Sequence, residues 1–556
     1  YFAIGSQDVD GGLNVTASNN TIDAKSGTGG SLTVNLGSIN RTGGLINFNL
    51  PTSGNITTTN TTLGGWATVN GTDYAKVVGG NIVAFTPVDY TNKDNAANWL
   101  NGEYITDSTG FFNTVSGTKQ LGGLRYTVAK STTVTVSPGQ TLGVDGTIIV
   151  APSVLNTNQV ITGGMMTGAS GGDLAVQQNS AGNFTIASQI VDNGTGTGFV
   201  KAGTGLVTLS NNGNTYTGAT RVAQGTLSVS SIKNGGVASG IGASSAAPSN
   251  LSLEGATLSY TGTGDTSDRG FTFAKSGAIV ESGVQVTNAN ANLTFSGLVS
   301  SPDGANFLKS GPGTLTLANP ANTFTGIVTV NGGLLGATTL ANGGQASSIG
   351  AGSSASANLV LNGGGLQYTG VTVGTDRGFT LGSSGGTIDV TQAGTTLTDS
   401  GIVTGSGRLT KNGAGTLVLT SANTYTGGNT VNGGILRAGA ANVLGALTSA
   451  PTNLANAAGV GLDLNNFDNL IGPLNGGGAN GGNVTLGSGT LRIASGNGSY
   501  SGVISGTGGV WRTDGGNQTF NGCNNTYTGA TTLQGATLTT DCLANGGQAS
   551  GIGASS

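Results

Sequence analysis

Residues 411–427 read KNGAGTLVLTSANTYTG, and closely similar stretches recur along the chain. The other copies are KAGTGLVTLSNNGNTYTG at residues 201–218, KSGPGTLTLANPANTFTG at residues 309–326, and the weaker RTDGGNQTFNGCNNTYTG at residues 512–529. Their aromatic residues, Tyr216, Phe324, Tyr425 and Tyr527, are separated by 108, 101 and 102 residues. A period of about a hundred residues therefore organises the second part of the chain.

Other phrases keep the same period. NGGVASGIGASS at residues 234–245 returns as NGGQASSIGAGSS at 342–354 and as NGGQASGIGASS at 545–556, whereas the third copy lacks the phrase and has drifted. This register predicts an N-terminal β-helical region over residues 1–197, with a less regular aromatic-rich segment over 66–126. It then predicts repeat 1 over 198–305, repeat 2 over 306–407, a degenerate repeat 3 over 408–509 and a partial repeat 4 over 510–556.

The composition indicates an all-β protein. Gly supplies 105 of the 556 residues and charged residues only 8 %, whereas ordinary domains contain about 7 % Gly and about 25 % charged residues. Short apolar runs such as residues 416–419 are punctuated by Gly-Gly or Asn-Gly turns and are too short to form a core individually. This pattern leaves a sandwich of hairpins or a solenoid. The many near-identical units and the abundance of Asn, Thr and Ser favour the solenoid, so we predict a parallel β-helix, an elongated rod.

Several function classes are disfavoured by composition alone. The chain contains no His, which removes the commonest general base and the commonest metal ligand. A net charge of -4, with 19 basic residues spread over the chain, gives no electrostatic footprint for nucleic acid. No apolar run reaches the roughly 18 residues that a membrane-spanning helix needs. We therefore expect no cofactor, no metal site, no nucleic-acid partner and no transmembrane segment.

The repeated motif resembles a known family. The order Lys-x-Gly-x-Gly-Thr-Leu-x-Leu followed by Asn-Thr-Tyr-Thr-Gly, as in residues 411–427, is similar to the autotransporter-associated β-helix repeat, or passenger-associated repeat, of large bacterial surface proteins. The resemblance covers residues 198–556, and GGWATVNGTDYAKVVGGNIVAFT at residues 64–86 resembles the phrase that often precedes such repeats. It implies a right-handed parallel β-helix at the bacterial cell surface, associated with the outer membrane. From the residues after the repeats we expect no translocator barrel in this sequence, which would be a departure from the family pattern.

The last repeat suggests self-association. Residues 545–556 repeat the phrase that continues into Ala246 in the first copy, so the fourth copy stops inside a repeat. An open β-helix end exposes unpaired strand edges, which invite pairing with another strand. We therefore expect that the chain either continues or meets another copy at this end.

Cys523 and Cys542 are the two cysteines of the sequence and lie 19 residues apart, close to the length of one coil. On adjacent coils they can reach the Cα separation of about 5.5 Å that a disulfide needs. We predict a structural disulfide, with free buried thiols as the alternative. A metal or redox site is disfavoured because the spacing is not that of a CxxC motif.

Acidic residues would have to build any catalytic site on this scaffold. The candidate clusters are Asp8 with Asp10, Asp89 and Asp94 with Lys93, Asp265 and Asp268 with Arg269, and Asp463 with Asp468. The Asp268-Arg269 pair recurs as Asp376-Arg377. Since a catalytic site is usually needed only once, the recurrence favours a turn-fixing or ion-pair role, and we predict no catalytic residues.

Aromatic residues gather between residues 66 and 126, the least repetitive stretch. Trp66, Tyr90, Trp99 and Tyr104 are the candidates for a ligand or partner surface, because flat rings can stack on sugars. The alternative, which we favour, is that these rings form the local core of a loop or cap.

These features predict a non-enzymatic extracellular protein that serves in structure or adhesion, either by cell-surface attachment or by self-assembly into filaments. The partners expected are further copies of the chain, surface glycans and other cells. The alternatives are a polysaccharide-processing enzyme on the same scaffold, which needs one non-repeated acidic cluster with Arg or Lys, and a carbohydrate-binding adhesin that uses the N-terminal aromatic residues.

Overall fold

The computed structural model describes residues 2–3, 5–8, 11–16, 19–26, 30–446 and 450–555. These residues wind into about 23 turns of a parallel β-solenoid, which confirms the predicted fold class. The chain divides into two compact units, Tyr1–Gln285 and Val286–Ser556. The predicted acidic cluster of Asp8 and Asp10 cannot be assessed, because Asp10 and the side chain of Asp8 lie outside the described residues.

The first unit begins with a short stack of parallel strands, paired in the orders β2-β6-β9, β4-β8-β10, β3-β7 and β1-β5. Its strands are β1 (Phe2–Ala3), β2 (Gly5–Asp8), β3 (Leu13–Val15), β4 (Asn19–Asp23), β5 (Lys25–Ser26), β6 (Leu32–Asn35), β7 (Ile39–Arg41), β8 (Leu45–Asn49) and β9 (Gly54–Thr57). The stack is followed by β10 (Ala67–Val69), β11 (Asp73–Val78) and β12 (Asn81–Ala84), in which β11 runs antiparallel to both neighbours and β12 antiparallel to β9. This antiparallel hairpin ends the parallel pairing of the short stack.

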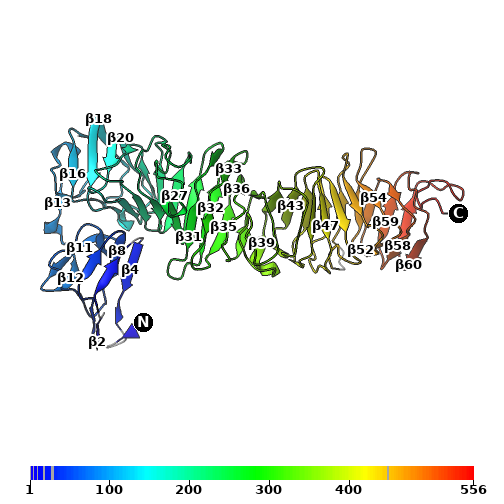
Figure 1. Cartoon of the computed structure of the whole chain (residues 1–556), viewed down its shortest axis with the longest axis horizontal. Helices are drawn as coiled ribbons and strands as arrows, with labels where there is room; N and C mark the ends of the chain where they lie inside the picture. The colour runs from blue at the N-terminus through cyan, green and yellow to red at the C-terminus, as the bar shows by residue number, and fades with distance from the viewer. Residues whose placement is uncertain are drawn as a thin grey trace. The chain divides into compact units, whose positions relative to one another are not determined.

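A second, longer stack fills the rest of the first unit and is built mainly on two parallel sheets (Figure 1). The first sheet contains β13 (Thr91–Asn92), β14 (Tyr104–Thr106), β17 (Gly123–Tyr126), β19 (Thr147–Val150), β21 (Leu174–Gln178), β24 (Phe199–Ala202), β26 (Thr220–Val222), β28 (Leu251–Glu254) and β31 (Phe271–Ala274). The second contains β15 (Thr114–Val115), β18 (Thr132–Val144), β20 (Gln159–Thr167), β22 (Asn183–Ile186), β25 (Leu206–Leu209), β27 (Gly225–Val229) and β29 (Ala256–Tyr260), with β16 (Lys119–Leu121) beside β18 and β23 (Gln189–Ile190) beside β20. The second sheet continues after β29 into β32 (Glu281–Val286), which ends at the border of the unit, and β30 (Asp265–Ser267) lies between β29 and β31 in the chain.

The GGWATV phrase joins the two stacks of the first unit. The Gly65 carbonyl accepts a hydrogen bond from the Thr147 amide at 2.9 Å, and Arg125 pairs with Asp73 at 2.9 Å. A Cβ atom on Gly65 would lie 2.6 Å from the Gly146 Cα atom, so the backbones approach too closely for any larger residue. The segment that resembles the phrase preceding the repeats is therefore a junction between stacks.

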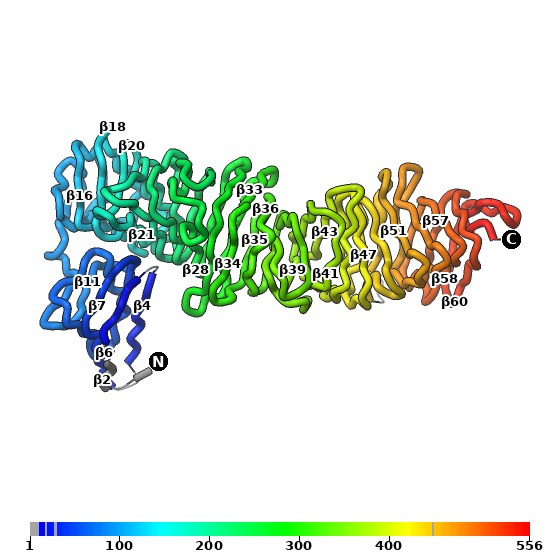
Figure 2. The backbone as a smooth tube through the Cα atoms, viewed as in Figure 1, coloured from blue at the N-terminus to red at the C-terminus, as the bar shows by residue number. Residues whose placement is uncertain are grey.

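The second unit winds four parallel sheets, and Figures 1 and 2 show its coils following one another from β36 through β47 to β58. The longest ladder contains β33 (Asn292–Phe295), β36 (Thr314–Leu317), β38 (Leu334–Ala337), β40 (Gly365–Tyr368), β43 (Gly386–Val390), β46 (Leu409–Asn412), β48 (Asn429–Val431), β50 (Thr452–Leu454), β53 (Leu474–Gly476), β56 (Gly498–Tyr500), β59 (Asn517–Phe520) and β61 (Thr537–Thr540). A second ladder contains β35 (Asn306–Ser310), β37 (Val328–Val330), β39 (Leu359–Leu361), β42 (Phe379–Leu381) and β45 (Val403–Gly405), and β34 (Val299–Ser300) lies between β33 and β35 in the chain. The third contains β41 (Val373–Thr375), β44 (Thr396–Asp399), β47 (Thr416–Leu419), β49 (Ile435–Ala438), β51 (Gly461–Asp463), β54 (Asn483–Thr485) and β57 (Ile504–Ser505), and the fourth contains β52 (Asn469–Ile471), β55 (Leu491–Ile493), β58 (Val510–Thr513) and β60 (Thr531–Gln534).

The core is a set of columns in which one apolar side chain stacks on its equivalent in the next coil. One column runs through Leu315, Leu335, Leu366 and Ile388, which are register partners and are at most 4 % exposed. Each buried side chain of this kind contributes about 1.5–3 kcal/mol relative to exposure. Because each coil contacts mainly its neighbours, the coils can repeat without a larger core.

Helical structure in the described residues is restricted to single turns of 3₁₀ helix. These turns are η1 (Pro87–Asp89), η2 (Ala96–Asn98), η3 (Pro152–Val154), η4 (Pro248–Asn250) and η5 (Ser356–Asn358). No helix in the described part of the chain has the length and apolar character needed to cross a membrane.

Candidate functional site

The Asn of each NT(Y/F)TG motif is an inward-facing bridge between three coils. Asn423 accepts a hydrogen bond from the Val403 amide and donates one to the Val443 carbonyl, both at 2.7 Å. Asn214, Asn322 and Asn525 make the same two kinds of contact, at 2.8 to 3.2 Å. All four Asn residues are at most 5 % exposed. The motif therefore fixes the spacing of consecutive coils, since a buried amide needs partners on both sides.

The aromatic residue of the motif is also buried, and its hydroxyl group has a partner four residues later. The Tyr216 hydroxyl lies 2.7 Å from Thr220 Oγ1, and the Tyr527 hydroxyl lies 2.7 Å from Thr531 Oγ1. In repeat 2 the aromatic residue is Phe324, and the residue four positions later is Val328. Repeat 2 therefore lacks both the Tyr hydroxyl group and its Thr partner, so neither polar group is left buried without a hydrogen bond.

Substituting this pair tests the relationship. We expect Tyr216→Phe to lower the free energy of unfolding by about 1 kcal/mol, because one buried hydrogen bond is lost. The double variant Tyr216→Phe with Thr220→Val copies the pair of repeat 2, so its cost should be smaller than the sum of the two single costs. Urea unfolding of the four proteins measures this coupling, and strictly additive costs would contradict it.

The Lys that opens each motif is a buried clamp. Lys411 Nζ donates to the carbonyl oxygens of Asn412, Gly413 and Gly433 at 2.7, 2.9 and 3.0 Å. Lys201 and Lys309 likewise hold three carbonyl oxygens at 2.6 to 3.0 Å. Burial lowers the pKa of Lys411 to about 8. An ammonium group has three donors, so it satisfies three carbonyl groups of the Gly turn and the following coil at once.

The fourth copy uses Arg512 in the same place. Its guanidinium group donates to the carbonyl oxygens of Ile493 at 3.1 Å, Thr513 at 2.8 Å and Gly515 at 2.6 Å. Arg512 is 1 % exposed. The clamp therefore persists where the motif itself has weakened.

The recurring Asp-Arg pairs hold the NGG loops through hydrogen bonds, which is the turn-fixing one of the two roles expected from the sequence. Asp268 accepts a hydrogen bond from the Gly235 amide at 2.7 Å, and Asp376 accepts one from the Gly343 amide at 2.6 Å. Arg269 donates to Ser244 Oγ at 2.7 Å and to the Gly242 carbonyl at 3.0 Å. Both Asp residues and Arg269 thereby hold a loop between coils.

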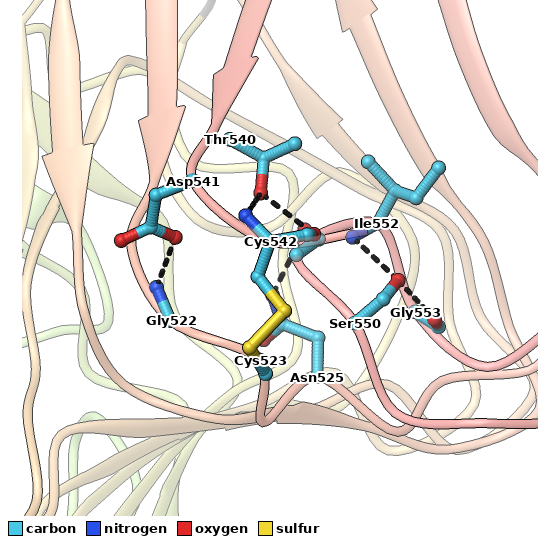
Figure 3. Close-up of a disulfide and its surroundings, with 10 residues drawn as sticks. Gly522, Cys523, Asn525, Thr540, Asp541, Cys542, Ser550, Ile552 and Gly553 are labelled. Carbon is cyan, nitrogen blue, oxygen red and sulfur yellow. Dashed lines mark hydrogen bonds between the residues drawn. A yellow bond between two sulfur atoms is a disulfide. The ribbon is translucent and has the colours of Figure 1, made fainter. Parts of the chain in front are cut away.

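The two cysteines lie in the last coils of the chain (Figure 3). Cys523 and Cys542 form a disulfide in the structure, with their Cα atoms 5.3 Å apart. Beside it, Asp541 accepts a hydrogen bond from the Gly522 amide at 2.7 Å. The covalent bond and this hydrogen bond both link the turn at 522–523 to residues 541–542.

Reduction of the disulfide should loosen these coils. A bond that closes a loop of this length stabilises by about 3 kcal/mol, mainly by restricting the unfolded chain. We expect dithiothreitol, or the variant Cys523→Ser with Cys542→Ser, to raise hydrogen exchange and proteolysis between residues 517 and 552. Coils around residues 309–330, which contain no cysteine, serve as the internal control. Equal protection with and without the bond at 517–552 would contradict the expectation.

The predicted aromatic surface residues are not gathered on one face. Tyr90 and Tyr104 share a cluster with Tyr74, whose ring centre lies 4.8 Å from that of Tyr104. Trp99 is fully buried, and its indole N–H donates to the Lys93 carbonyl at 2.9 Å. Trp66 packs on the junction between the stacks of the first unit. Tyr90 is 8 % exposed, so Tyr90 and Trp99 contribute to local cores, while Trp66 and Tyr104 are half-buried.

The remaining acidic candidates hold separate structural contacts. Asp89 pairs with Lys76 at 2.5 Å, and this hydrogen bond lowers the pKa of Asp89 to about 2. Asp94 accepts hydrogen bonds from the amides of residues 108 and 109, and Lys93 pairs with Glu103 instead. Asp265 pairs with Lys233, Asp463 pairs with Arg437, and Asp468 accepts a hydrogen bond from the Thr490 amide. Each of these carboxylates therefore has its own structural partner, either a basic side chain or a backbone amide.

Sequence reasoning did not locate an outward-facing row on the second unit, which we call the polar row. Its members are neighbours on consecutive coils, none is charged, and all are half-buried or exposed. They are Thr387, Thr410, Thr430, Asn453, Asn475, Ser499, Thr519 and Thr539. Stacked strands are about 4.8 Å apart, so hydroxyl and amide groups recur at that spacing. Their alternation with inward apolar residues was the signal that could have identified them.

The polar row is hollowed near one end. Asn475, Ser499 and Thr519 of the row line a shallow depression together with Asn497 and Asn517. Asn475 donates to Asn453 Oδ1 at 3.1 Å, which fixes the orientation of the amide. The row therefore presents both ordered and open hydrogen-bonding groups.

Comparison with known proteins identifies the repeats. Residues 199–229, 307–344, 409–438 and 512–539 match the family described as the passenger-associated-transport-repeat. The whole chain is 52 % identical over 562 residues to the adhesin BmaC autotransporter of Brucella suis biovar 1 (strain 1330). The chain spans 16 % of the length of that relative. No solved structure matches the chain.

Proposed function

This chain belongs to the proteins that carry passenger-associated-transport repeats, and from that premise we propose that it is an extracellular adhesive segment at the bacterial cell surface. The observation that carries the proposal is the polar row, because its uncharged polar side chains recur at the same outward position from β43 to β61. The similarity of the whole chain to part of an adhesin supports the same function.

The inward-facing polar residues of the repeats stabilise the coil, whereas the outward-facing ones are available to bind a partner. The side chains of the Lys clamp and the Asn bridge point into the coil, where they form hydrogen bonds with backbone groups. The polar row is turned outward and carries no charge. An uncharged array of hydroxyl and amide groups offers many weak hydrogen bonds in sequence, which suits multivalent attachment to surface glycans.

We do not assign an enzymatic function to the chain. Asp89, Asp265 and Asp463 each form an ion pair with a basic side chain. Catalysis by two carboxylates needs both groups free to act on a bound sugar, whereas these three carboxylates are held by their basic partners. The relative that spans the chain is named an adhesin.

Adhesion of coated particles tests the proposal. Inert particles that carry the purified chain should attach to host cells, and attachment should fall when the cells are treated with glycosidases. The variant Thr410→Lys with Thr519→Lys places two long charged side chains in the polar row and should reduce attachment towards that of uncoated particles. Thr398→Lys with Thr485→Lys makes the same change on another outward face, on β44 and β54, and should leave attachment intact.

Electron microscopy of the same preparations distinguishes adhesion from self-assembly. Attached single molecules support the adhesive proposal, whereas filaments that form without cells and do not attach would contradict it. If the two double Lys variants attach equally well, the polar row is not the adhesive surface.

A further inference from the structure

One coil of repeat 2 has an acidic residue, Asp399, at a position where the preceding and the following repeat have an aromatic residue. Residues 397–403 read LTDSGIV, and residues 293–299 of the preceding repeat read LTFSGLV. Phe295 and the corresponding Tyr500 of the later copy are at most 1 % exposed. Asp399 closes β44 in the same inward register, opposite Thr375 and Leu419, and is 3 % exposed.

The Asp399 carboxyl group has only half of its oxygen atoms satisfied. Oδ1 accepts a hydrogen bond from the Gly401 amide at 2.8 Å. Oδ2 is buried and has no hydrogen-bond partner. An ionised carboxylate can only accept hydrogen bonds, so the buried Oδ2 is costly in the charged form.

A cavity borders this carboxyl group. It has about 20 Å³ of space for water, enough for a single water molecule. Its walls are otherwise apolar apart from Thr375 and Arg377 and are formed by Leu340, Ile349, Leu359, Leu366, Phe379, Ile388, Leu397 and Leu417. The cavity lies where the smaller Asp side chain replaces a ring, and a protonated carboxyl group can donate to a water molecule held there.

The charged groups around the cavity do not neutralise Asp399. Arg377 is the charged side chain that shares the wall, but its guanidinium group donates to Ser347 Oγ at 3.3 Å and to the Gly350 carbonyl at 3.0 Å. The negative charge of Asp376 disfavours ionisation of Asp399 and so raises the pKa of Asp399 further. The neighbouring strands β41 and β47 contribute no titratable side chain.

We propose that Asp399 is a proton-operated joint: the neutral carboxyl group keeps the coils of β41, β44 and β47 closed, and its ionisation lets them open locally. With this joint, local opening of the coils of β41, β44 and β47 is rare at acidic pH and more frequent at neutral pH and above. It depends neither on the polar row nor on adhesion.

The sign follows from the two states of the chain. Burial is the main cause that raises the pKa of Asp399 to about 7, whereas an Asp in an unfolded chain has a pKa of about 3.9. The stabilising contribution is therefore complete below about pH 4 and is lost as the pH rises to about 7. A difference of about three pKa units corresponds to a change of about a thousandfold in the local opening equilibrium.

Hydrogen exchange of the full chain tests the joint. After correction for the intrinsic exchange rate, amides of β41, β44 and β47 in the wild type should lose protection between about pH 4 and about pH 7. Asp399→Asn keeps the shape of the side chain but cannot ionise, so its protection should not change over this range. Coils around β55 and β58 serve as the internal control in both proteins.

Two further variants complete the test. Asp399→Phe restores the ring of the other copies and should be the best protected protein at pH 8. Phe295→Asp transplants the acid to the preceding repeat and should bring pH-dependent opening to β33 and β36. The proposal is overturned if the wild type and Asp399→Asn show the same dependence on pH, or if the wild type shows none.

Discussion

Replacing Lys411 by Met should lower the free energy of unfolding by about 4 kcal/mol, because three carbonyl groups lose their donor at once and each unpaired buried group costs about 1–3 kcal/mol. Nζ of Lys411 holds the carbonyl oxygens of Asn412, Gly413 and Gly433. Met has a similar length but no donor, so the packing of the side chain is largely kept. A urea titration of the full chain, followed through the lowest transition, measures the loss.

The matched control is an exposed lysine. Lys130 is exposed, and Lys130→Met should change the free energy of unfolding by at most about 0.5 kcal/mol. If Lys411→Met were as mild as this control, the clamp would not be a main determinant of the coil. Lys309→Met, in the preceding repeat, should behave like Lys411→Met because Lys309 holds the three corresponding carbonyl groups of its own coil and the next.

The second large effect is expected at the Asn bridge. Asn423→Leu should cost about 3 kcal/mol, since the Val403 amide and the Val443 carbonyl are both left unpaired in the core. Because each coil contacts mainly its neighbours, the damage should be centred on the coils that contain these residues. Hydrogen exchange, read peptide by peptide, should show lost protection there before the rest of the second unit.

An exposed Asn supplies the comparison. Asn480 lies on the surface, and Asn480→Leu should stay within about 0.5 kcal/mol of the wild type. A uniform loss of protection along the unit in Asn423→Leu would contradict the view that the Asn bridge acts between neighbouring coils.

The sequence was sufficient to predict the parallel solenoid because the same short motif recurs with strand-length apolar runs. The recurrence of Lys201, Lys309 and Lys411 before a Gly-x-Gly turn was visible as well. Their burial was not, since isolated lysines are almost always exposed and only the folded turn gathers three carbonyl groups around each Nζ. Composition and spacing describe which positions matter, whereas the direction of a side chain depends on the register of the coils.

The first unit was less predictable for the same reason. The aromatic residues between 66 and 126 could be counted, but their distribution over two separate clusters and a junction depends on contacts between distant segments. Trp66 contacts the junction through residues more than a hundred positions later, such as Val200. Asp399 was equally hidden, because a single acid among repeated rings is apparent only when the copies are compared position by position.

The polar row should be the surface of the chain that contacts the target cell. Single cysteines introduced as Thr410→Cys in the row and as Thr398→Cys on the other face can be labelled with a maleimide in the presence and absence of host cells. We expect cell binding to slow labelling at position 410 and to leave position 398 unchanged. Unchanged labelling at position 410 on chains that have bound to cells would contradict an adhesive role for the polar row.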